Sequence, residues 1–207
     1  MKLDRGYLIV FEGIDGTGKS THCHLLTEYF QDNGLPVLRL REPTQGVWGR
    51  KIRNLLVQGR GGVTPEEELA WFINDRKEDV ERNIRPALDQ KKIILMDRYY
   101  FSTTAYQGAL GLNPETILRE NEAFAPAPDR VFIFTAPLPV CLERIRQSRN
   151  SGPDTFEKLE YLEKVQKIFD TFTGPRFRRV DSSASQEKVQ ARLRDEMVAL
   201  FPDYLSR

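Results

Sequence analysis

One glycine-rich segment near the N-terminus constrains this chain more than any other stretch. Residues 13–20 read GIDGTGKS and match the pattern G-x-x-x-x-G-K-[ST]. An apolar run at residues 8–11, typical of a short buried strand, precedes the segment, and a helical pattern follows it. Glycines let successive backbone N–H groups converge on a phosphate, and the helix adds its own unpaired N–H groups and the positive end of its dipole. The segment therefore predicts a nucleoside triphosphate site.

Two side chains at the end of this segment have specific expected roles. Lys19 can reach the outer phosphates of the nucleotide, and the Ser20 hydroxyl is placed to hold Mg²⁺. We expect the residues that bind the nucleoside triphosphate here to be Gly13, Ile14, Asp15, Gly16, Thr17, Gly18, Lys19, Ser20 and Thr21.

The charge balance and the cysteine pattern argue against several classes of protein. The 207 residues include 31 basic and 30 acidic side chains, so nothing in the net charge of +1 indicates a nucleic-acid or membrane partner. No apolar run approaches membrane-spanning length, and the N-terminus lacks the apolar core of a signal peptide. The two cysteines lack the spacing of metal ligands. We expect one domain over 1–207, in a cytoplasmic protein.

Strand-like and helix-like segments alternate along the chain. Besides the first apolar run, strands are predicted at residues 36–40, 92–96, 130–134 and 177–180, with helical patterns between them. Such alternation is typical of a parallel sheet. We therefore predict an α/β, P-loop, three-layer fold with a roughly five-stranded parallel sheet covered by helices on both faces.

Charged residues stand where two of these strands end. Arg41 and Glu42 follow the second strand, and they are either ligand contacts or ordinary solvated turn residues. Asp97 ends the third strand, and an acid at that place in a chain with a phosphate loop indicates a magnesium ligand. Arg98 beside it can hold a phosphate through two hydrogen bonds.

The helix that begins after Thr64 carries one residue that breaks its apolar pattern. Thr64 and Glu67 form a capping box, and the apolar stripe runs from position 69 to position 88. Continuing the stripe by helical steps reaches Arg76, one turn after Phe72. An inward arginine is costly unless it is paired or meets a polar ligand. Arg76 is therefore either part of a buried ion pair or a donor that reaches into a pocket beside Phe72.

Two further segments have polar character that admits two interpretations. Residues 102–108, STTAYQG, either line a pocket or cap and terminate a short helix. Residues 146–153, RQSRNSGP, are either a solvated helix end or a mobile loop that closes over a triphosphate and brings arginines to it. We call residues 146–155 the lid segment.

Taken together, these motifs resemble those of the thymidylate kinase family, whose members phosphorylate dTMP with ATP. The matching segments lie in the family's order over nearly the whole chain. They are FEGIDGTGKST (11–21), REPT (41–44), LAWFINDR (69–76), DRYYFSTTAYQG (97–108), and LERIRQSR followed by DTFE (142–157).

The resemblance implies roles for individual positions. Phe72 corresponds to the ring that stacks on thymine, and Arg76 to the arginine that hydrogen-bonds its edge. Tyr106 corresponds to the tyrosine that favours deoxyribose, and Arg144 to a residue over adenine. The implied dTMP-binding set is Asp15, Arg41, Phe72, Arg76, Arg98, Thr103, Tyr106 and Gln107, and the implied Mg²⁺ ligands are Ser20, Asp97 and Glu42.

The resemblance also implies where the arginine that assists phosphoryl transfer comes from. Family members carry it either in the phosphate loop or in the lid, and this chain has Gly16 at the loop position. It is therefore similar to the lid-arginine kind, with Arg146 and Arg149 as candidates that act with Lys19, Asp97 and Arg98 in transfer. The chain departs from the family pattern in its REPTQG turn, in a lid arginine displaced by one residue, and at Thr155.

The resulting hypothesis is in-line transfer of the γ-phosphoryl group of ATP to dTMP, with Mg²⁺ as cofactor. The alternatives are a kinase of the same fold for another nucleotide or nucleoside, and a non-enzymatic nucleotide-binding switch. The switch is disfavoured because the chain lacks an Asn-Lys-x-Asp guanine motif. The resemblance further implies a homodimer through helices near residues 47–57 and 64–88.

Overall fold

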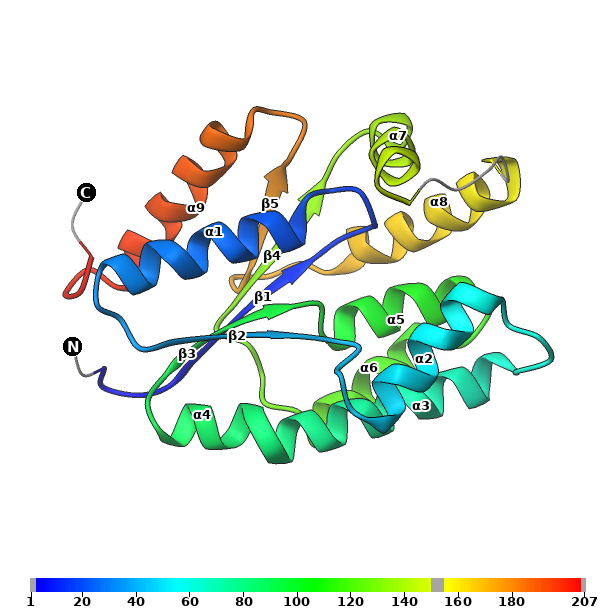
Figure 1. The fold of residues 1–207 in the computed structure, drawn as a ribbon, viewed down its shortest axis with the longest axis horizontal. Coiled ribbons are helices and arrows are strands. Elements are labelled where there is room, and N and C mark those ends of the chain that lie inside the picture. The colour runs from blue at the N-terminus through cyan, green and yellow to red at the C-terminus, as the bar shows by residue number, and fades with distance from the viewer. Residues whose placement is uncertain (1–2, 150–154, 206–207) are drawn as a thin grey trace.

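The core of the protein is a five-stranded parallel sheet. The computed structural model describes residues 3–149 and 155–205, without the side chains of 148, 149 and 155–158. The strand order is β2-β3-β1-β4-β5, and every neighbouring pair is parallel (Figure 1). The predicted sheet is thereby confirmed. The strands are β1 (Tyr7–Glu12), β2 (Val37–Arg41), β3 (Ile93–Asp97), β4 (Arg130–Thr135) and β5 (Phe177–Asp181).

Helices connect the strands, and none of those in the described residues is long and apolar enough to cross a membrane. The helices that precede β3 are α1 (Lys19–Asp32), α2 (Val47–Gln58), α3 (Pro65–Asp79), the π-helical turn η1 (Val80–Ile84) and α4 (Arg85–Asp89). Those that follow β3 are α5 (Tyr100–Ala109), α6 (Pro114–Glu122), α7 (Leu138–Arg149), α8 (Thr155–Thr171) and α9 (Gln186–Leu200).

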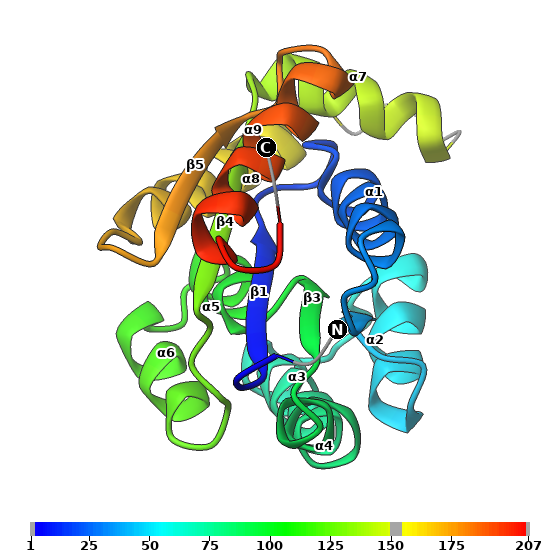
Figure 2. The same ribbon diagram turned by 90° about the vertical axis from the view of Figure 1, so that its left-hand side faces the viewer.

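The central strands are buried on both faces, which explains their continuous apolar runs. Successive side chains of a strand point to opposite faces. In β1, Ile9 and Phe11 pack with α1 and α9, whereas Leu8 and Val10 pack with η1, α4, α5 and α8. Figure 1 accordingly shows α1 and α9 on one side of the sheet and α3 to α6 on the other. In Figure 2, α2 and α6 lie on opposite sides of α3.

The helical stretch before β3 differs from the single regular helix that the apolar stripe predicts. It consists of α3, the π-helical turn η1 and the short helix α4, which follow one another without a gap. Pro86, the second residue of α4, has no N–H group, and a proline ring clashes with the carbonyl four residues earlier in a regular helix. A widened turn just before the proline accommodates both constraints.

The lid segment also has different limits from those predicted. Residues 146–149 continue α7, and Thr155 already begins α8. The rest of the predicted lid, residues 150–154, lies outside the described residues.

Gly13 offers a direct test of how tightly β1 packs against β4. It has a φ of +130°, and a Cβ there would lie 2.3 Å from the Phe134 carbonyl oxygen. Gly13→Ala should lower the free energy of unfolding by about 3 kcal/mol, because a backbone clash adds to the strained φ. Gly34→Ala is the matched control, with a φ of +69° and no atom within 4 Å of its Cβ position; it should cost about 1 kcal/mol. If urea denaturation shows the same loss of unfolding free energy for both variants, the close approach of Gly13 to the Phe134 carbonyl oxygen is contradicted.

Candidate active site

The register of the sheet brings the charged strand ends into one row. Asp97 at the end of β3 pairs with Phe11 of β1 on one side and with Arg41 of β2 on the other. The loop that follows β1 therefore begins beside Asp97 and Arg98. This is the edge of an open parallel sheet at which ligands bind.

The loop between β1 and α1 is shaped to receive an anion. Gly13, Gly16 and Gly18 all have positive φ angles, and a Cβ on Gly16 would lie 2.4 Å from the Cys141 carbonyl oxygen of α7. Gly18 is the N-cap residue of α1. Because glycine has no side chain, the N-cap position provides no side-chain hydrogen bond to the first N–H groups of the helix. Backbone N–H groups at a helix start bind phosphate.

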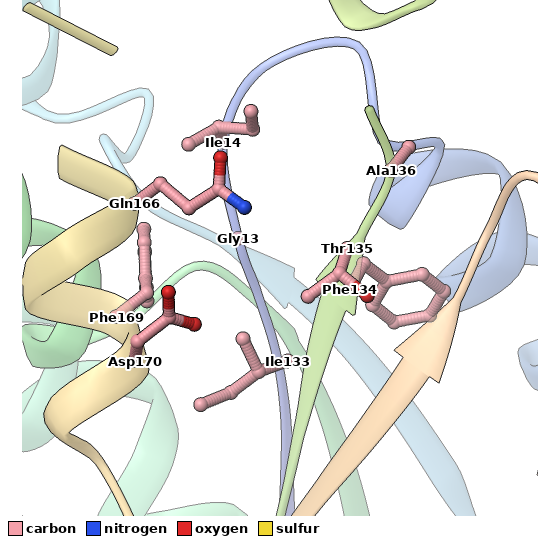
Figure 3. A pocket seen from close by; sticks show the side chains of 9 residues that line it. All are labelled: Gly13, Ile14, Ile133, Phe134, Thr135, Ala136, Gln166, Phe169 and Asp170. Carbon is pink, nitrogen blue, oxygen red and sulfur yellow. The ribbon is translucent and has the colours of Figure 1, made fainter. Parts of the chain in front are cut away.

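A cavity behind this loop is too small for a nucleotide. Its volume is about 10 Å³, which is the space of a single water molecule. Figure 3 shows side chains of α8 on one side of it and the end of β4 on the other, with Gly13 and Ile14 between them. This cavity is therefore not a nucleotide site. The cavity is lined by Gly13, Ile14, Ile133, Phe134, Thr135, Ala136, Gln166, Phe169 and Asp170.

Lys19 lies folded into the loop. Its side chain is buried, and its Nζ donates to the Ile14 carbonyl oxygen at 2.7 Å and to the Thr17 Oγ1 at 3.4 Å. Burial, followed by the positive charge of Arg98, lowers the pKa of Lys19 to about 7. A phosphate near this ammonium group would replace the carbonyl contact with a full negative charge.

Ser20 and Asp97 form the part of the site that is suited to a metal ion. The Ser20 Oγ donates to an Asp97 carboxylate oxygen at 2.5 Å, and the Arg41 Nε lies 3.7 Å from the same oxygen. Mg²⁺ takes oxygen ligands and is usually held by one or two carboxylates together with substrate phosphates. The pair fits that pattern. The described residues contain no group of three or more His, Cys, Asp or Glu side chains that could hold a metal ion.

Arg98 links the phosphate loop to α5. Its backbone has a φ of +70°, a strained conformation for a residue with a side chain. One guanidinium nitrogen donates to the Gly13 carbonyl oxygen at 3.3 Å and to the Ser102 Oγ at 2.8 Å, and the other donates to the Asp15 carboxylate. The guanidinium carbon lies 5.2 Å from the centre of the Tyr106 ring.

Tyr106 also contacts the phosphate loop directly. Its hydroxyl oxygen accepts a hydrogen bond from the Asp15 N–H at 3.1 Å. Arg98, Asp15 and Tyr106, predicted from three separate segments, thus meet at one place.

Glu12 is a central residue of the site that the sequence analysis did not identify. It is fully buried, and its carboxylate accepts hydrogen bonds from the Tyr99 N–H at 2.8 Å, from the Ser102 N–H at 3.1 Å and from the Ser102 hydroxyl. It therefore caps α5, whose own N-cap residue, Tyr99, provides no side-chain cap. Burial raises the pKa of Glu12, and the Ser102 hydrogen bond opposes that shift. A sequence signal existed, because Glu12 ends a buried apolar strand just as Asp97 does.

The predicted base-binding residues lie on facing turns of α3 and α5. Arg76 Nη2 donates to the Thr103 Oγ1 at 3.0 Å. Two turns earlier along α3 and one turn further along α5, the Gln107 Nε2 donates to Glu68 at 3.0 Å. Phe72 lies midway between Glu68 and Arg76 on α3. It is half-buried, and neither of the two core clusters of described residues includes it. Its ring therefore has a face that the protein core does not use.

Arg76 is a member of a buried ion pair, one of the two outcomes that its sequence pattern predicts. Its side chain is 1% exposed, and it donates to the Asn121 Oδ1 at 2.5 Å and to the Glu42 carboxylate. Its Nε has no hydrogen-bond partner in the described part of the chain. Burial raises the pKa of Glu42 to about 8, although the charge of Arg76 opposes the shift. Glu42 thus lies with Arg76, whereas the Ser20 hydroxyl bonds Asp97.

The arginines of α7 differ in their surroundings. Arg144 lies against the phosphate loop, where it donates to the Gly16 carbonyl oxygen at 3.3 Å and to the Ser182 carbonyl oxygen at 3.1 Å. Arg146 is exposed and pairs with Glu143 of its own helix. The side chain of Arg149, at the end of α7, lies outside the described residues.

Comparison with known proteins shows similarity to one family. The family model described as thymidylate kinase matches residues 11–193. The thymidylate kinase of Akkermansia muciniphila is 45% identical over 201 residues, covering 97% of this chain and 96% of its own. That of Desulfotalea psychrophila is 45% identical, covering 92% and 93%, and that of Brachyspira hyodysenteriae is 40% identical, covering 89% and 90%.

The lowered pKa of Lys19 predicts a specific dependence of stability on pH. Between about pH 7 and its unfolded pKa of about 10.4, Lys19 keeps a proton in the unfolded chain that it loses in the folded protein. The free energy of unfolding should therefore rise with pH in this window. Lys19→Met lacks that rise, so wild type should gain stability relative to the variant between pH 6.5 and 9 in urea denaturation. If the difference in unfolding free energy between wild type and Lys19→Met does not change with pH, the lowered pKa of Lys19 is contradicted.

Proposed function

The chain belongs to the thymidylate kinase family, and on that premise we propose that it transfers the γ-phosphoryl group of ATP to dTMP. The products are ADP and dTDP. The observation that carries the proposal is the position of Arg98, whose guanidinium group contacts both the phosphate loop at Gly13 and the first turn of α5 at Ser102. A cation that lies between the site of the phosphoryl donor and the site of the acceptor is suited to bind the phosphate of the acceptor.

The phosphate loop and its neighbours form the donor side. Backbone N–H groups of residues 13–18 and of the start of α1, including Thr21, bind the phosphates of ATP, and Lys19 neutralises the outer ones. Arg144, which bonds the loop at Gly16, stacks on adenine. Ser20 and Asp97 hold Mg²⁺, which when bound neutralises charge on the transferring phosphoryl group.

The facing turns of α3 and α5 form the acceptor side. Thymine stacks on Phe72, and its polar edge meets the hydrogen-bonding groups of Arg76, Thr103 and Gln107. Tyr106 packs against the sugar. Asp15 contacts the 3′-hydroxyl, and Arg41 and Arg98 clamp the acceptor phosphate. That phosphate is already an anion, so transfer depends on positioning and on charge neutralisation rather than on a strong general base.

An arginine of the lid segment completes the charge neutralisation, with Arg146 and Arg149 as the candidates. The close contact between Gly16 and Cys141 supports this source, because it leaves no space for an arginine side chain at position 16. An arginine donated to such a transition state is worth roughly 10³-fold or more in rate.

The protein acts as a homodimer in the cytoplasm, with ATP and dTMP as its small-molecule partners. The support for the dimer is the exposure of three apolar side chains on α2, because Val47, Leu56 and Val57 are 64%, 54% and 85% exposed. Exposed apolar patches mark interaction surfaces, and two-fold dimers are the commonest assemblies.

The activity is tested by following dTDP formation from ATP with each nucleoside monophosphate in turn. We expect dTMP to be preferred over dCMP and dGMP, and Lys19→Ala to lower kcat/KM for dTMP by at least about 100-fold. Ala191→Gly, an exposed change on α9, serves as the control and should retain activity. Equal rates with all monophosphates, or full activity of Lys19→Ala, would refute the proposal.

The dimer is tested by introducing a charge at one of these exposed apolar positions of α2. Val57→Asp should yield monomers in sedimentation velocity at micromolar concentration, because an unpaired carboxylate would be buried at the contact. The matched variant Ala191→Asp adds the same charge on α9 and should leave the dimer intact. A monomeric wild type, or a dimeric Val57→Asp, would contradict the assignment.

A further inference from the structure

Gln107 carries an unsatisfied hydrogen-bond acceptor in the protein interior. The side chain is 1% exposed, and its Nε2 donates to the Glu68 carboxylate at 3.0 Å. Its Oε1 is buried and has no hydrogen-bond partner in the described part of the chain. Because buried polar atoms are nearly always paired, an orphaned acceptor in a built network indicates a ligand group that supplies the missing donor.

The contact with Glu68 determines which end of the Gln107 amide remains without a hydrogen-bond partner. A carboxylate can only accept hydrogen bonds, so it attracts the NH₂ end of the amide and repels the oxygen end. Glu68 is itself 1% exposed, and Arg60 holds it as an ion pair through its Nε at 2.7 Å and its Nη2 at 3.4 Å. The orientation of the Gln107 amide is therefore imposed by charges that lie behind it.

Arg60 is in turn held in place from a different element. Its guanidinium carbon lies 5.9 Å from the centre of the Tyr161 ring on α8, and the Tyr161 hydroxyl donates to the Tyr106 carbonyl oxygen at 3.0 Å. The chain from Arg60 to Glu68 to Gln107 thus connects the α2–α3 loop with α3 and α5.

The unpaired groups on these helices form a complementary set. Gln107 presents an acceptor, and Arg76, two turns from Glu68 on α3, has an unpaired donor at Nε. The half-buried ring of Phe72 lies between Glu68 and Arg76 along the same helix. A planar ligand that pairs with this set needs an N–H donor next to a carbonyl oxygen.

We propose that Glu68 and Arg60 are positioning residues that orient the Gln107 amide and thereby select a pyrimidine with a protonated N3. Thymine and uracil have an N3–H beside the O4 carbonyl, whereas N3 of cytosine is a lone pair that would face the Gln107 oxygen. The inference rests on the proposed function, since it concerns the acceptor of that reaction. It assigns part of the choice against cytosine to residues that do not themselves contact the base.

The test is the ratio of kcat/KM values for dTMP, dUMP and dCMP in wild type and Glu68→Gln. An amide at position 68 can present either a donor or an acceptor, so the Gln107 amide becomes free to turn over. We expect the dTMP-to-dCMP ratio to fall by about tenfold or more, with activity on dCMP rising. The dTMP-to-dUMP ratio should not change, because both bases present the same N3–H and O4.

Glu67→Gln is the matched control, since it alters the capping box in the same helical turn and leaves Glu68 in place. Its activities on the three substrates should change in parallel, if at all. Arg60→Gln provides a second, independent variant and should move the dTMP-to-dCMP ratio in the same direction as Glu68→Gln. If wild type prefers dTMP but both variants keep its dTMP-to-dCMP ratio, the inference fails while the proposed function stands. If wild type does not phosphorylate dTMP, the proposed function itself fails.

Discussion

The hydrogen bonds of the buried Glu12 carboxylate join the two halves of the candidate site. Glu12 ends β1 immediately before the phosphate loop, and it accepts from two N–H groups at the start of α5. Arg98 lies between these elements with a strained backbone, which persists only where the surroundings hold it firmly. The carboxylate thus fixes the distance between the loop proposed to hold ATP and the helix proposed to hold dTMP. Since phosphoryl transfer depends on alignment, that distance is itself part of the proposed catalysis.

The polar groups of the site are held by one another. Lys19 bonds the carbonyl of its own loop, Ser20 bonds Asp97, and Arg76 bonds Glu42 and Asn121. Buried charges are expensive unless paired, and these contacts provide partners. The same contacts limit how far each side chain must move to meet a ligand. A site preorganised in this way loses little side-chain entropy on binding.

The sequence predicted the architecture well, because that architecture depends on local patterns. Strands buried on both faces require apolar runs, and the polar residue that ends each run marks the binding edge of the sheet. The partners of Arg76 could not be predicted from local patterns. Glu42 is 34 residues earlier and Asn121 is 45 residues later, and only the packing of helices brings them together. The π-helical turn was missed because the apolar stripe continues through it. The individual roles of the site residues remain predictions that rest on placement and resemblance.

The contact between Gly16 and α7 has a consequence for how such a site can change in evolution. A side chain at position 16 would meet the Cys141 carbonyl oxygen, which is backbone and cannot be removed by substitution. An arginine in the loop and a helix at this distance are therefore mutually exclusive states of the fold. A lineage that moved the proposed assisting arginine from the lid into the loop would therefore also have to shift α7 away. The source of the assisting charge is thus a coupled property of two segments, inherited together or lost together.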